Sequence, residues 1–275
     1  MRLKDKVAIV TGGGGGLGEG IALCFAREGA HVVVSDINMD LAEKVASKVK
    51  EMGRKSLAMQ TDVRDLSQVE GLVAKTIDEM GAIDILACSH GVSGMTHREH
   101  DPDEPITLEG ITEEDWDLTL DVNLKGVFLC NRAVTPHFKE KGGGKIINVS
   151  SVGGRRGNPS LFAYSISKAA VIALTQALAQ QLAPYDVNVN TICPGIIYTP
   201  MWQEGAKLLA KMDPRFKDLD ISPKDALDFV VEMSIPFKRM QTAEDIGNAA
   251  VFLASDEAKE ITGQALNVCG GMAFN

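Results

Sequence analysis

A tyrosine and a lysine four residues apart, Tyr164 and Lys168, are the residues in this sequence best suited to chemistry. The apolar segment over 169–179 predicts a helix, on which positions i and i+4 lie one turn apart on the same face. A phenol beside an ammonium group transfers protons, because the cation favours the phenolate and lowers the pKa of the tyrosine. Ser151 follows a short apolar run over 145–149 and is placed to hydrogen-bond the substrate oxygen that the tyrosine serves. The three side chains predict acid–base chemistry at a hydroxyl or carbonyl group.

A glycine-rich segment near the start of the chain indicates that a dinucleotide is bound. Residues 7–10 predict a buried strand, which runs into Thr11-Gly-Gly-Gly-Gly-Gly-Leu-Gly18. A helix over 19–28 and a second strand over 31–35 follow, and Asp36 ends that strand. This is the order of the βαβ unit in which N–H groups at a helix N-terminus approach a pyrophosphate. Asp36 lies 18 residues after Gly18, near the expected separation of about 20.

Asp36 also indicates which dinucleotide is bound. A carboxylate at this position accepts hydrogen bonds from the ribose hydroxyls and repels a 2′-phosphate. Neither the glycine turn nor positions 35 and 37 hold a lysine or arginine that would offset this repulsion. The sequence therefore predicts NAD rather than NADP. The alternative is that Asp36 only caps the helix predicted over 38–52.

The rest of the chain continues the alternation of strand and helix. Further strands are predicted over 55–60, 83–88, 187–193 and 264–268. Helices are predicted to begin at Ser67, at Thr112, where Asp115 completes a capping box, and at Thr242. The helix from Thr112 is predicted to run through Trp116, Asn123 and Phe128. Seven strands with helical crossovers predict an α/β, Rossmann-type, doubly wound parallel sheet with helices on both faces, in which 1–275 form a single domain.

Composition excludes several classes of protein. The net charge of −9 argues against a nucleic acid or an anionic membrane as partner, and no apolar run approaches the roughly 18 residues that span a bilayer. Residues 1–6 lead directly into a strand, so no signal peptide is expected. The five scattered cysteines predict buried free thiols in a reducing cytoplasm. No metal site is predicted, because His97 and His100 lie in a polar loop over 92–112 without regular ligand spacing.

These motifs together resemble the short-chain dehydrogenase/reductase family over essentially the whole chain. The matching motifs are Thr11-Gly12-x-x-x-Gly16-x-Gly18, Asp62, Asn123-Leu-Lys-Gly, Ser151 placed 13 residues before Tyr164-x-x-x-Lys168, and Pro194-Gly195 leading to Thr199. Ser150 is the less favoured candidate for the catalytic serine. The resemblance implies strand order 3-2-1-4-5-6-7, a nicotinamide cofactor and a homotetramer.

The resemblance also implies roles for particular residues. Tyr164 acts as general acid and base, Ser151 polarises the substrate oxygen, Lys168 binds the nicotinamide ribose, and Asn123 anchors a water that relays protons towards Lys168. Asp62 and Val63 contact the adenine, and Ile197 and Thr199 hold the carboxamide. The full set of implied cofactor-binding residues is Gly12, Gly16, Leu17, Gly18, Asp36, Ile37, Asp62, Val63, Ser89, Gly91, Tyr164, Lys168, Pro194, Gly195, Ile197 and Thr199.

One motif departs from the family. Cys88-Ser89-His90-Gly91 stands where the family usually has Asn-Asn-Ala-Gly. Ser89 replaces only part of the hydrogen bonding of an asparagine, and His90 adds a titratable ring on the adenosine side. We interpret the change as a tolerated variant that shifts cofactor affinity modestly.

The substrate is indicated less sharply than the cofactor. A lid is predicted at about 200–241, with aromatic residues among charges and a short helix starting at Ser222-Pro223. Segments 157–168, 194–202 and 270–275 resemble the polyol and acetoin/butanediol dehydrogenase branch. That likeness implies NAD-dependent interconversion of a small secondary alcohol, diol or polyol and its ketone. Arg155 and Arg156 allow two interpretations: they bind an anionic substrate, or they lie in a solvated turn.

Features of the sequence oppose three other functions. A 3-oxoacyl carrier-protein reductase is opposed by Asp36 and by the acidic charge. A non-catalytic NAD-binding protein is opposed by the presence of Ser151, Tyr164 and Lys168, and an epimerase by the lack of a larger substrate domain.

The sequence also bears on assembly. The helices predicted around Asn123 and Ala169 carry apolar residues on more surface than one sheet face covers. We therefore expect a homo-oligomer, a tetramer by the resemblance, in which the apolar tail over 272–275 reaches a neighbouring subunit.

Overall fold

The computed structural model describes residues 1–94, 107–158, 161–212, 215–216 and 220–275. One sheet of seven parallel strands runs through it in the order β3-β2-β1-β4-β5-β6-β7. The strands are β1 (Val7–Thr11), β2 (His31–Asp36), β3 (Ser56–Gln60), β4 (Ile85–Cys88), β5 (Gly144–Val149), β6 (Val187–Pro194) and β7 (Ala265–Val268). The strand order and the doubly wound α/β fold are confirmed.

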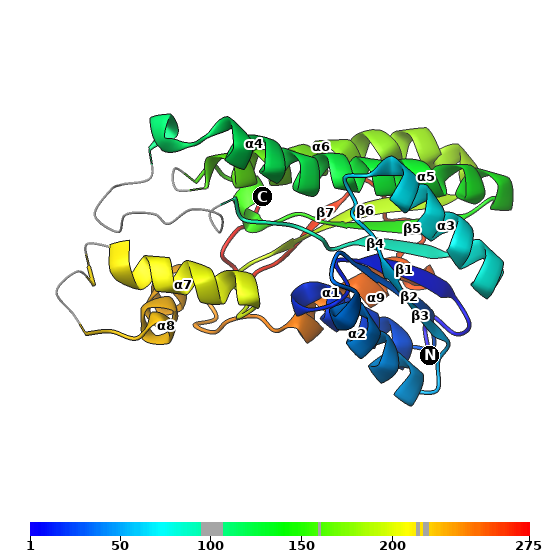
Figure 1. The fold of residues 1–275 in the computed structure, drawn as a ribbon, viewed down its shortest axis with the longest axis horizontal. Helices are drawn as coiled ribbons and strands as arrows, with labels where there is room; N and C mark the ends of the chain where they lie inside the picture. The colour runs from blue at the N-terminus through cyan, green and yellow to red at the C-terminus, as the bar shows by residue number, and fades with distance from the viewer. Residues whose placement is uncertain (95–106, 159–160, 213–214, 217–219) are drawn as a thin grey trace.

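Helices cover both faces of this sheet, which lies between them as a middle layer (Figure 1). The helices are α1 (Gly16–Arg27), α2 (Met39–Glu51), α3 (Leu66–Met80), α4 (Glu113–Leu120), α5 (Gly126–Lys141), α6 (Phe162–Leu182), α7 (Pro200–Met212), α8 (Pro223–Ser234) and α9 (Ala243–Ala254). α1, α2 and α9 pack on one face, and α3, α5 and α6 on the other. In β1, Ala8 and Val10 face the first layer and Ile9 faces the second, as the pleat requires. All of β1, β4 and β6 is buried, as expected of strands covered on both faces.

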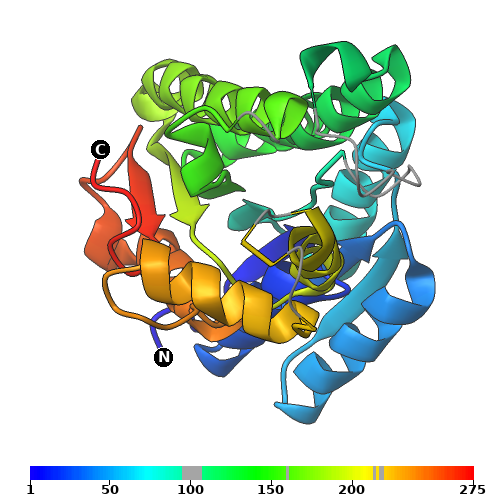
Figure 2. The ribbon, with the colours of Figure 1, turned by 90° about the vertical axis from the view of Figure 1, so that its left-hand side faces the viewer.

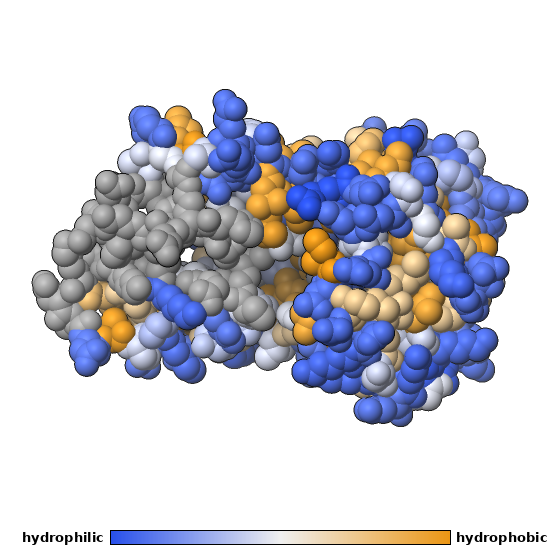
Figure 3. Space-filling model, viewed as in Figure 1, coloured by the Kyte–Doolittle hydropathy of each residue, from blue (hydrophilic) through white to orange (hydrophobic). Residues whose placement is uncertain are grey.

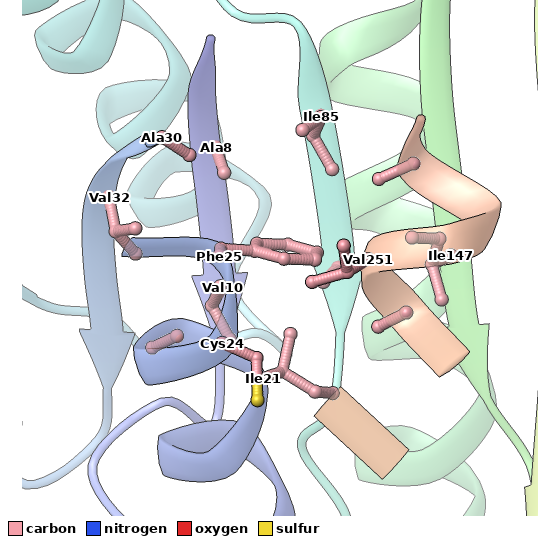
Figure 4. Close-up of a cluster of buried hydrophobic side chains, with 14 of the residues drawn as sticks. Ala8, Val10, Ile21, Cys24, Phe25, Ala30, Val32, Ile85, Ile147 and Val251 are labelled. Atoms are coloured by element: carbon pink, nitrogen blue, oxygen red, sulfur yellow. The ribbon is translucent and has the colours of Figure 1, made fainter. Parts of the chain in front are cut away.

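The first layer fixes the helix that follows the glycine turn. Phe25 extends from α1 across the sheet towards Ile85 of β4 and Val251 of α9 (Figure 4), and it is fully buried. α1 and α9 approach closely through glycines, since a Cβ at Gly20 would lie 2.5 Å from a carbonyl oxygen of α9 and one at Gly247 would lie 2.6 Å from Gly20 O. This packing holds the N-terminus of α1 at the end of β1.

Two helix starts differ from the sequence predictions. α3 is capped by Asp65 and not by Ser67, because the Asp65 carboxylate accepts hydrogen bonds from the N–H groups of Ser67 and Gln68. α1 begins at Gly16, three residues before the predicted start, since packing outweighs the low helical propensity of glycine. The predicted caps at Thr112, Ser222 and Thr242 are confirmed, and Thr242 forms a full capping box with Asp245.

The long helix predicted through Phe128 is present and contains a π-helical turn. This π-turn, Asp121–Lys125, joins α4 to α5 and has Asn123 at its centre. Such turns insert a residue into an α-helix and are frequent at functional sites. Hydrophobic periodicity predicted the helix but does not encode this insertion.

α7 and α8 lie beyond one end of the sheet (Figures 1 and 2). This is the carboxyl end, because α7 follows β6 directly. The two helices share a third apolar cluster with the segment after β6, built on Ile196, Leu227, Val231 and Ile235. Phe216 and Phe229 meet edge to face, with ring centres 5.5 Å apart.

α6 with its C-terminal turn, Phe162–Tyr185, is long and apolar enough by composition to cross a membrane. It instead packs on the sheet through Val171, Ala179 and Leu182, so its composition is that of a core helix. The five cysteines are free and buried, as predicted.

Candidate active site

A cavity of about 1250 Å³ opens at the carboxyl ends of the strands. On the face drawn in Figure 3, a hollow with apolar residues in its wall lies near the middle of the molecule. Open α/β sheets bind their ligands at this end. The residues lining the cavity include Gly12, Gly16, Leu17, Gly18, Asp36, Ile37, Asp62, Val63, Ser89, Gly91, Ser151, Tyr164, Lys168, Pro194, Gly195, Ile197 and Thr199. The structure therefore brings every residue predicted for the cofactor to one surface.

The glycine turn has the geometry that a pyrophosphate requires. Gly12 has φ +63°, and a Cβ at Gly18 would lie 2.0 Å from Gly12 O, so neither position admits a side chain without rearrangement. Gly15 caps α1 without a side-chain hydrogen bond, which leaves the first N–H groups of the helix to a bound anion. Thr199, from the segment after β6, packs across the turn, since a Cβ at Gly16 would lie 3.5 Å from its methyl carbon.

The Asp36 carboxylate stands beside this turn. One oxygen accepts a hydrogen bond from Gly14 N and the other from Asn38 N, both at 3.0 Å. Asn38 and not Asp36 caps α2, by accepting from Leu41 N at 3.2 Å, so the helix-cap alternative for Asp36 is wrong. In the described residues no cation forms an ion pair with Asp36.

The adjoining end of the cavity carries its own charge pair. The Arg64 guanidinium donates to both carboxylate oxygens of Asp62, at 2.9 and 2.6 Å. This hydrogen bonding lowers the pKa of Asp62. Arg64 is thereby neutralised by Asp62 and does not offset the charge of Asp36.

Three polar atoms in the cavity wall have no hydrogen-bond partner among the residues described: Thr61 Oγ1, Ser89 Oγ and His90 Nε2. The other ring nitrogen of His90 lies 2.7 Å from Thr11 Oγ1, which fixes the ring. Burial, assisted by the charge of Lys168, lowers the pKa of His90 to about 3, so its ring is neutral at physiological pH. All three atoms are buried, and His90 Nε2 faces Gly126, where an added Cβ would lie 3.0 Å from it.

Ser151 and Tyr164 meet at the other end of the cavity. Ser151 Oγ accepts from Gly153 N at 3.0 Å, and it lies near the tyrosine ring, since a Cβ at Gly153 would be 3.4 Å from both. Ser150 Oγ donates to the backbone oxygen of Lys168 at 2.6 Å and is buried. Ser150 therefore anchors α6, and Ser151 is the serine that faces the cavity.

Lys168 is buried one turn after Tyr164. Its Nζ donates to Val149 O at 3.0 Å and lies 5.8 Å from the centre of the tyrosine ring. Desolvation lowers the pKa of Lys168 to about 8. Desolvation also raises the pKa of Tyr164, and the hydrogen bond from Ser151 offsets only part of that. The expectation that the cation lowers the tyrosine pKa does not hold for the protein alone, because desolvation is the dominant effect on both groups.

Asn123 lies behind this pair. Its side-chain oxygen accepts from Val92 N at 2.8 Å, and its amide nitrogen donates to Val92 O at 2.9 Å and Ser167 Oγ at 3.1 Å. Ser167 Oγ in turn donates to Tyr164 O. The amide thus braces α6 against the segment after β4, and it is fully buried.

Sequence reasoning missed one neighbour of Ser151. The Cys193 thiol at the end of β6 is buried near Ser150, Ser151 and Arg155. Burial raises the pKa of Cys193. The one signal in the sequence is its position directly before Pro194-Gly195.

The structure describes no group of three histidine, cysteine or acidic side chains that could hold a metal ion. His97 and His100 lie outside the described residues.

Known proteins resemble this chain in both sequence and structure. A family model described as enoyl-(acyl carrier protein) reductase matches residues 13–273. The (2S)-[(R)-hydroxy(phenyl)methyl]succinyl-CoA dehydrogenase subunit BbsD of Thauera aromatica is 36% identical, with 100% of this chain and 99% of that protein covered. Galactitol 2-dehydrogenase of Agrobacterium fabrum is 37% identical, with 98% of each chain covered. The crystal structure of carveol dehydrogenase from Mycobacterium avium in complex with NAD has a TM-score of 0.89 at 30% identity, covering 98% of each chain. The chain belongs to the short-chain dehydrogenase/reductase family.

Proposed function

We propose that this protein is an NAD-dependent oxidoreductase that interconverts a secondary alcohol and its ketone. The substrate class is a small diol, a polyol or a related alcohol. One observation carries the proposal: Ser151, Tyr164 and Lys168 lie on the wall of the same cavity as the glycine turn and Asp36.

The proposed mechanism assigns a separate task to each side chain. When bound, NAD accepts the hydride that leaves the carbinol carbon. Tyr164 takes the hydroxyl proton during oxidation and returns it during reduction. Ser151, oriented by Gly153 N, hydrogen-bonds the reacting oxygen. Lys168 holds positive charge beside the tyrosine and binds the ribose, and Asn123 keeps α6 in register with the segment over 91–92.

The cofactor assignment rests on Asp36, whose carboxylate lines the cavity beside the glycine turn. The carveol dehydrogenase structure contains NAD, which supports the same choice for this chain.

The lid, the assembly and the compartment are further parts of the proposal. Residues 200–241 act as the substrate lid of one catalytic domain over 1–275, and α7 and α8 carry it. The exposed apolar side chains of Phe128 and Ile166 support a homotetramer. Five free cysteines support the cytoplasm as the site of action, with a small molecule rather than a nucleic acid or membrane as partner.

A second candidate is reduction of a 3-oxoacyl group on a carrier protein. The description of the matching family model favours an acyl carrier protein as partner. Asp36 and the net charge of −9 oppose it, because such an enzyme is expected to use NADP and a basic docking surface.

The test is a screen of the purified protein with NAD against alcohols, diols and sugar alcohols, with NADH absorbance as the signal. Tyr164→Phe keeps the ring and its packing but removes the ionisable oxygen. We expect turnover to fall at least about 10²–10⁴-fold while NAD still binds. Near-normal turnover of a verified substrate by Tyr164→Phe would overturn the mechanism.

A further inference from the structure

The two adjacent arginines after the catalytic serine have different environments. Arg155 turns towards the edge of the sheet, where it donates to Asn267 Oδ1 at 3.1 Å and to Ala265 O of β7. Arg156 is exposed and lines the cavity, and its guanidinium has no hydrogen bond or ion pair with the residues described. The structure thus separates the pair into a structural arginine and an arginine that faces the ligand.

Charge is distributed unevenly along the cavity. Its acidic lining residues in the described chain, Asp36 and Asp62, lie at the ends of β2 and β3. Ser151 follows β5, three strands away from β2 in the sheet, which is roughly 14 Å at the usual strand spacing. Apart from Lys168, the charged lining residue near Ser151 in the described part of the chain is Arg156. Although the chain has a net charge of −9, the described lining residues around Ser151 therefore carry positive and no negative charge.

Arg156 is also close to the reacting groups. A Cβ at Gly153 would lie 3.4 Å from both Ser151 Oγ and a ring carbon of Tyr164, so the turn η3 (Val152–Gly154) packs against them. Arg156 is three positions after Gly153, which limits the distance between their Cα atoms to about 10 Å. Apolar side chains, Leu161 and Trp202, line the same end. The apolar side chains of the wall can therefore contact a carbon chain or ring, and Arg156 can bind an anionic group attached to it.

We propose that the substrate alcohol carries an anionic group, a carboxylate or a phosphate, and that Arg156 is the residue that selects it. The planar guanidinium binds either group through two parallel hydrogen bonds. Arg156 acts on specificity and not on the chemical step. The inference rests on the proposed function, since it names the substrate class of that same site.

The experiment compares matched substrates with NAD. The first pair is 3-hydroxybutanoate and its neutral amide, and the second is 3-hydroxybutanoyl-CoA and the same acyl group on uncharged pantetheine. We expect kcat/KM to favour the anionic member of at least one pair by about tenfold or more, in line with a charge-assisted hydrogen bond. The pair that shows the preference distinguishes a carboxylate from a phosphate. Arg156→Gln should remove the preference through KM, Arg156→Lys should keep part of it, and the exposed Lys50→Gln on α2 should leave it unchanged.

Binding gives a readout that does not depend on turnover. Calorimetric titration of the NAD-loaded protein with succinate and with inorganic phosphate should show binding of at least one anion, and Arg156→Gln should weaken it about tenfold or more. If Arg156→Gln binds both anions as the wild type does, or if the wild type turns over neutral and anionic substrates equally, the inference is wrong while the proposed function stands. If no alcohol is turned over but an anion binds through Arg156, the proposed function fails and the anion site stands.

Discussion

At the residue scale, the tyrosine and lysine of the site share one desolvated environment. Burial raises the pKa of Tyr164 and lowers the pKa of Lys168 to about 8, so it disfavours the charged form of each group in the protein alone. Groups this close titrate as a pair, and the first proton leaves the pair near pH 8. The form with one proton fewer is the one that accepts a proton from an alcohol, whether it is written as phenolate and ammonium or as phenol and amine.

The pH dependence of turnover follows from this. We predict that kcat/KM for oxidation rises tenfold per pH unit below about 8 and levels off above it, while kcat/KM for reduction is level below about 8 and falls above it. Lys168→Met should remove that titration and move the rise to higher pH, towards the raised pKa of Tyr164 alone. Profiles recorded from about pH 6 to 10 with saturating NAD check this. If kcat/KM for oxidation rises around the same pH in the wild type and in Lys168→Met, the Tyr164–Lys168 pair does not control the pH dependence.

Cofactor choice is a second residue-scale property. Asp36 has hydrogen bonds from Gly14 N and Asn38 N but no cation beside it among the residues described, so its charge faces the cavity uncompensated. We predict a kcat/KM for NAD that exceeds that for NADP by about 10²-fold or more, and a gap that narrows by about tenfold in Asp36→Asn. Steady-state rates with each cofactor measure both. Equal rates with the two cofactors in the wild type would contradict the assignment.

His90 gives a prediction about stability. Its folded pKa is about 3, well below the ordinary value of 6.5, so between these pH values the unfolded chain binds a proton that the folded chain does not. The stability contribution is therefore complete above about pH 6.5 and is lost as the pH falls towards 3. We predict that the free energy of unfolding falls between about pH 6.5 and 4.5 by roughly 2 kcal/mol more in the wild type than in His90→Asn. Urea denaturation at both pH values gives this difference, and equal losses in both proteins would contradict it.

At the element scale, Arg155 connects β7 to the turn that follows Ser151. Its guanidinium donates to Asn267 Oδ1 and Ala265 O, and its backbone N–H donates to Val152 O in that turn. We predict that Arg155→Ala lowers kcat by about tenfold, because small misplacements of a catalytic group are costly, and leaves the Kd of NAD within about twofold. Loosening of the Ser151–Tyr164 hydrogen bond should also shift the pH profile upward.

Asn267→Ala is the matched variant for this prediction. It removes one of the two β7 anchors of Arg155 and should act in the same direction with a smaller effect. Unchanged kcat and pH profile in Arg155→Ala would show that the arginine only fastens the edge of the sheet.

The individual elements show which features of the fold could be predicted from the sequence and which could not. Short apolar runs predicted all seven strands, and cap residues such as Ser222 and Thr242 predicted where helices begin. The π-turn at Asp121–Lys125 was not predictable, because it inserts a residue without changing the polarity of its neighbours. The raised pKa of Tyr164 was equally hidden, since the spacing of Tyr164 and Lys168 carries no information on burial. The roles of Arg155 and Arg156 depend on the path of the turn after Ser151, which spacing alone leaves undetermined.

At the scale of the whole molecule, several large apolar side chains are exposed on the surface of the single chain. Phe128 of α5 and Ile166 of α6 are each more than two-fifths exposed, and both lie in the helical layer that carries Tyr164 and Lys168. Phe274 near the chain terminus is almost fully exposed, although Asn267 Nδ2 holds the backbone around it by donating to Ala273 O and Asn275 O. Apolar side chains held outward on rigid elements are typical of protein interfaces.

We predict that the protein forms a homotetramer, with four copies of the 29.4 kDa chain, and that α5 and α6 form one of its interfaces. The double variant Phe128→Lys/Ile166→Lys should give a smaller particle, because it places charge where apolar surface is buried. Met233→Lys on α8 is the control, since that residue is also exposed but lies on the lid, and its particle should keep the wild-type mass. Light scattering on size-separated protein at micromolar concentration measures all three. A wild-type protein that elutes as a monomer would contradict the prediction, and an intact tetramer in the double variant would place the interface on another surface.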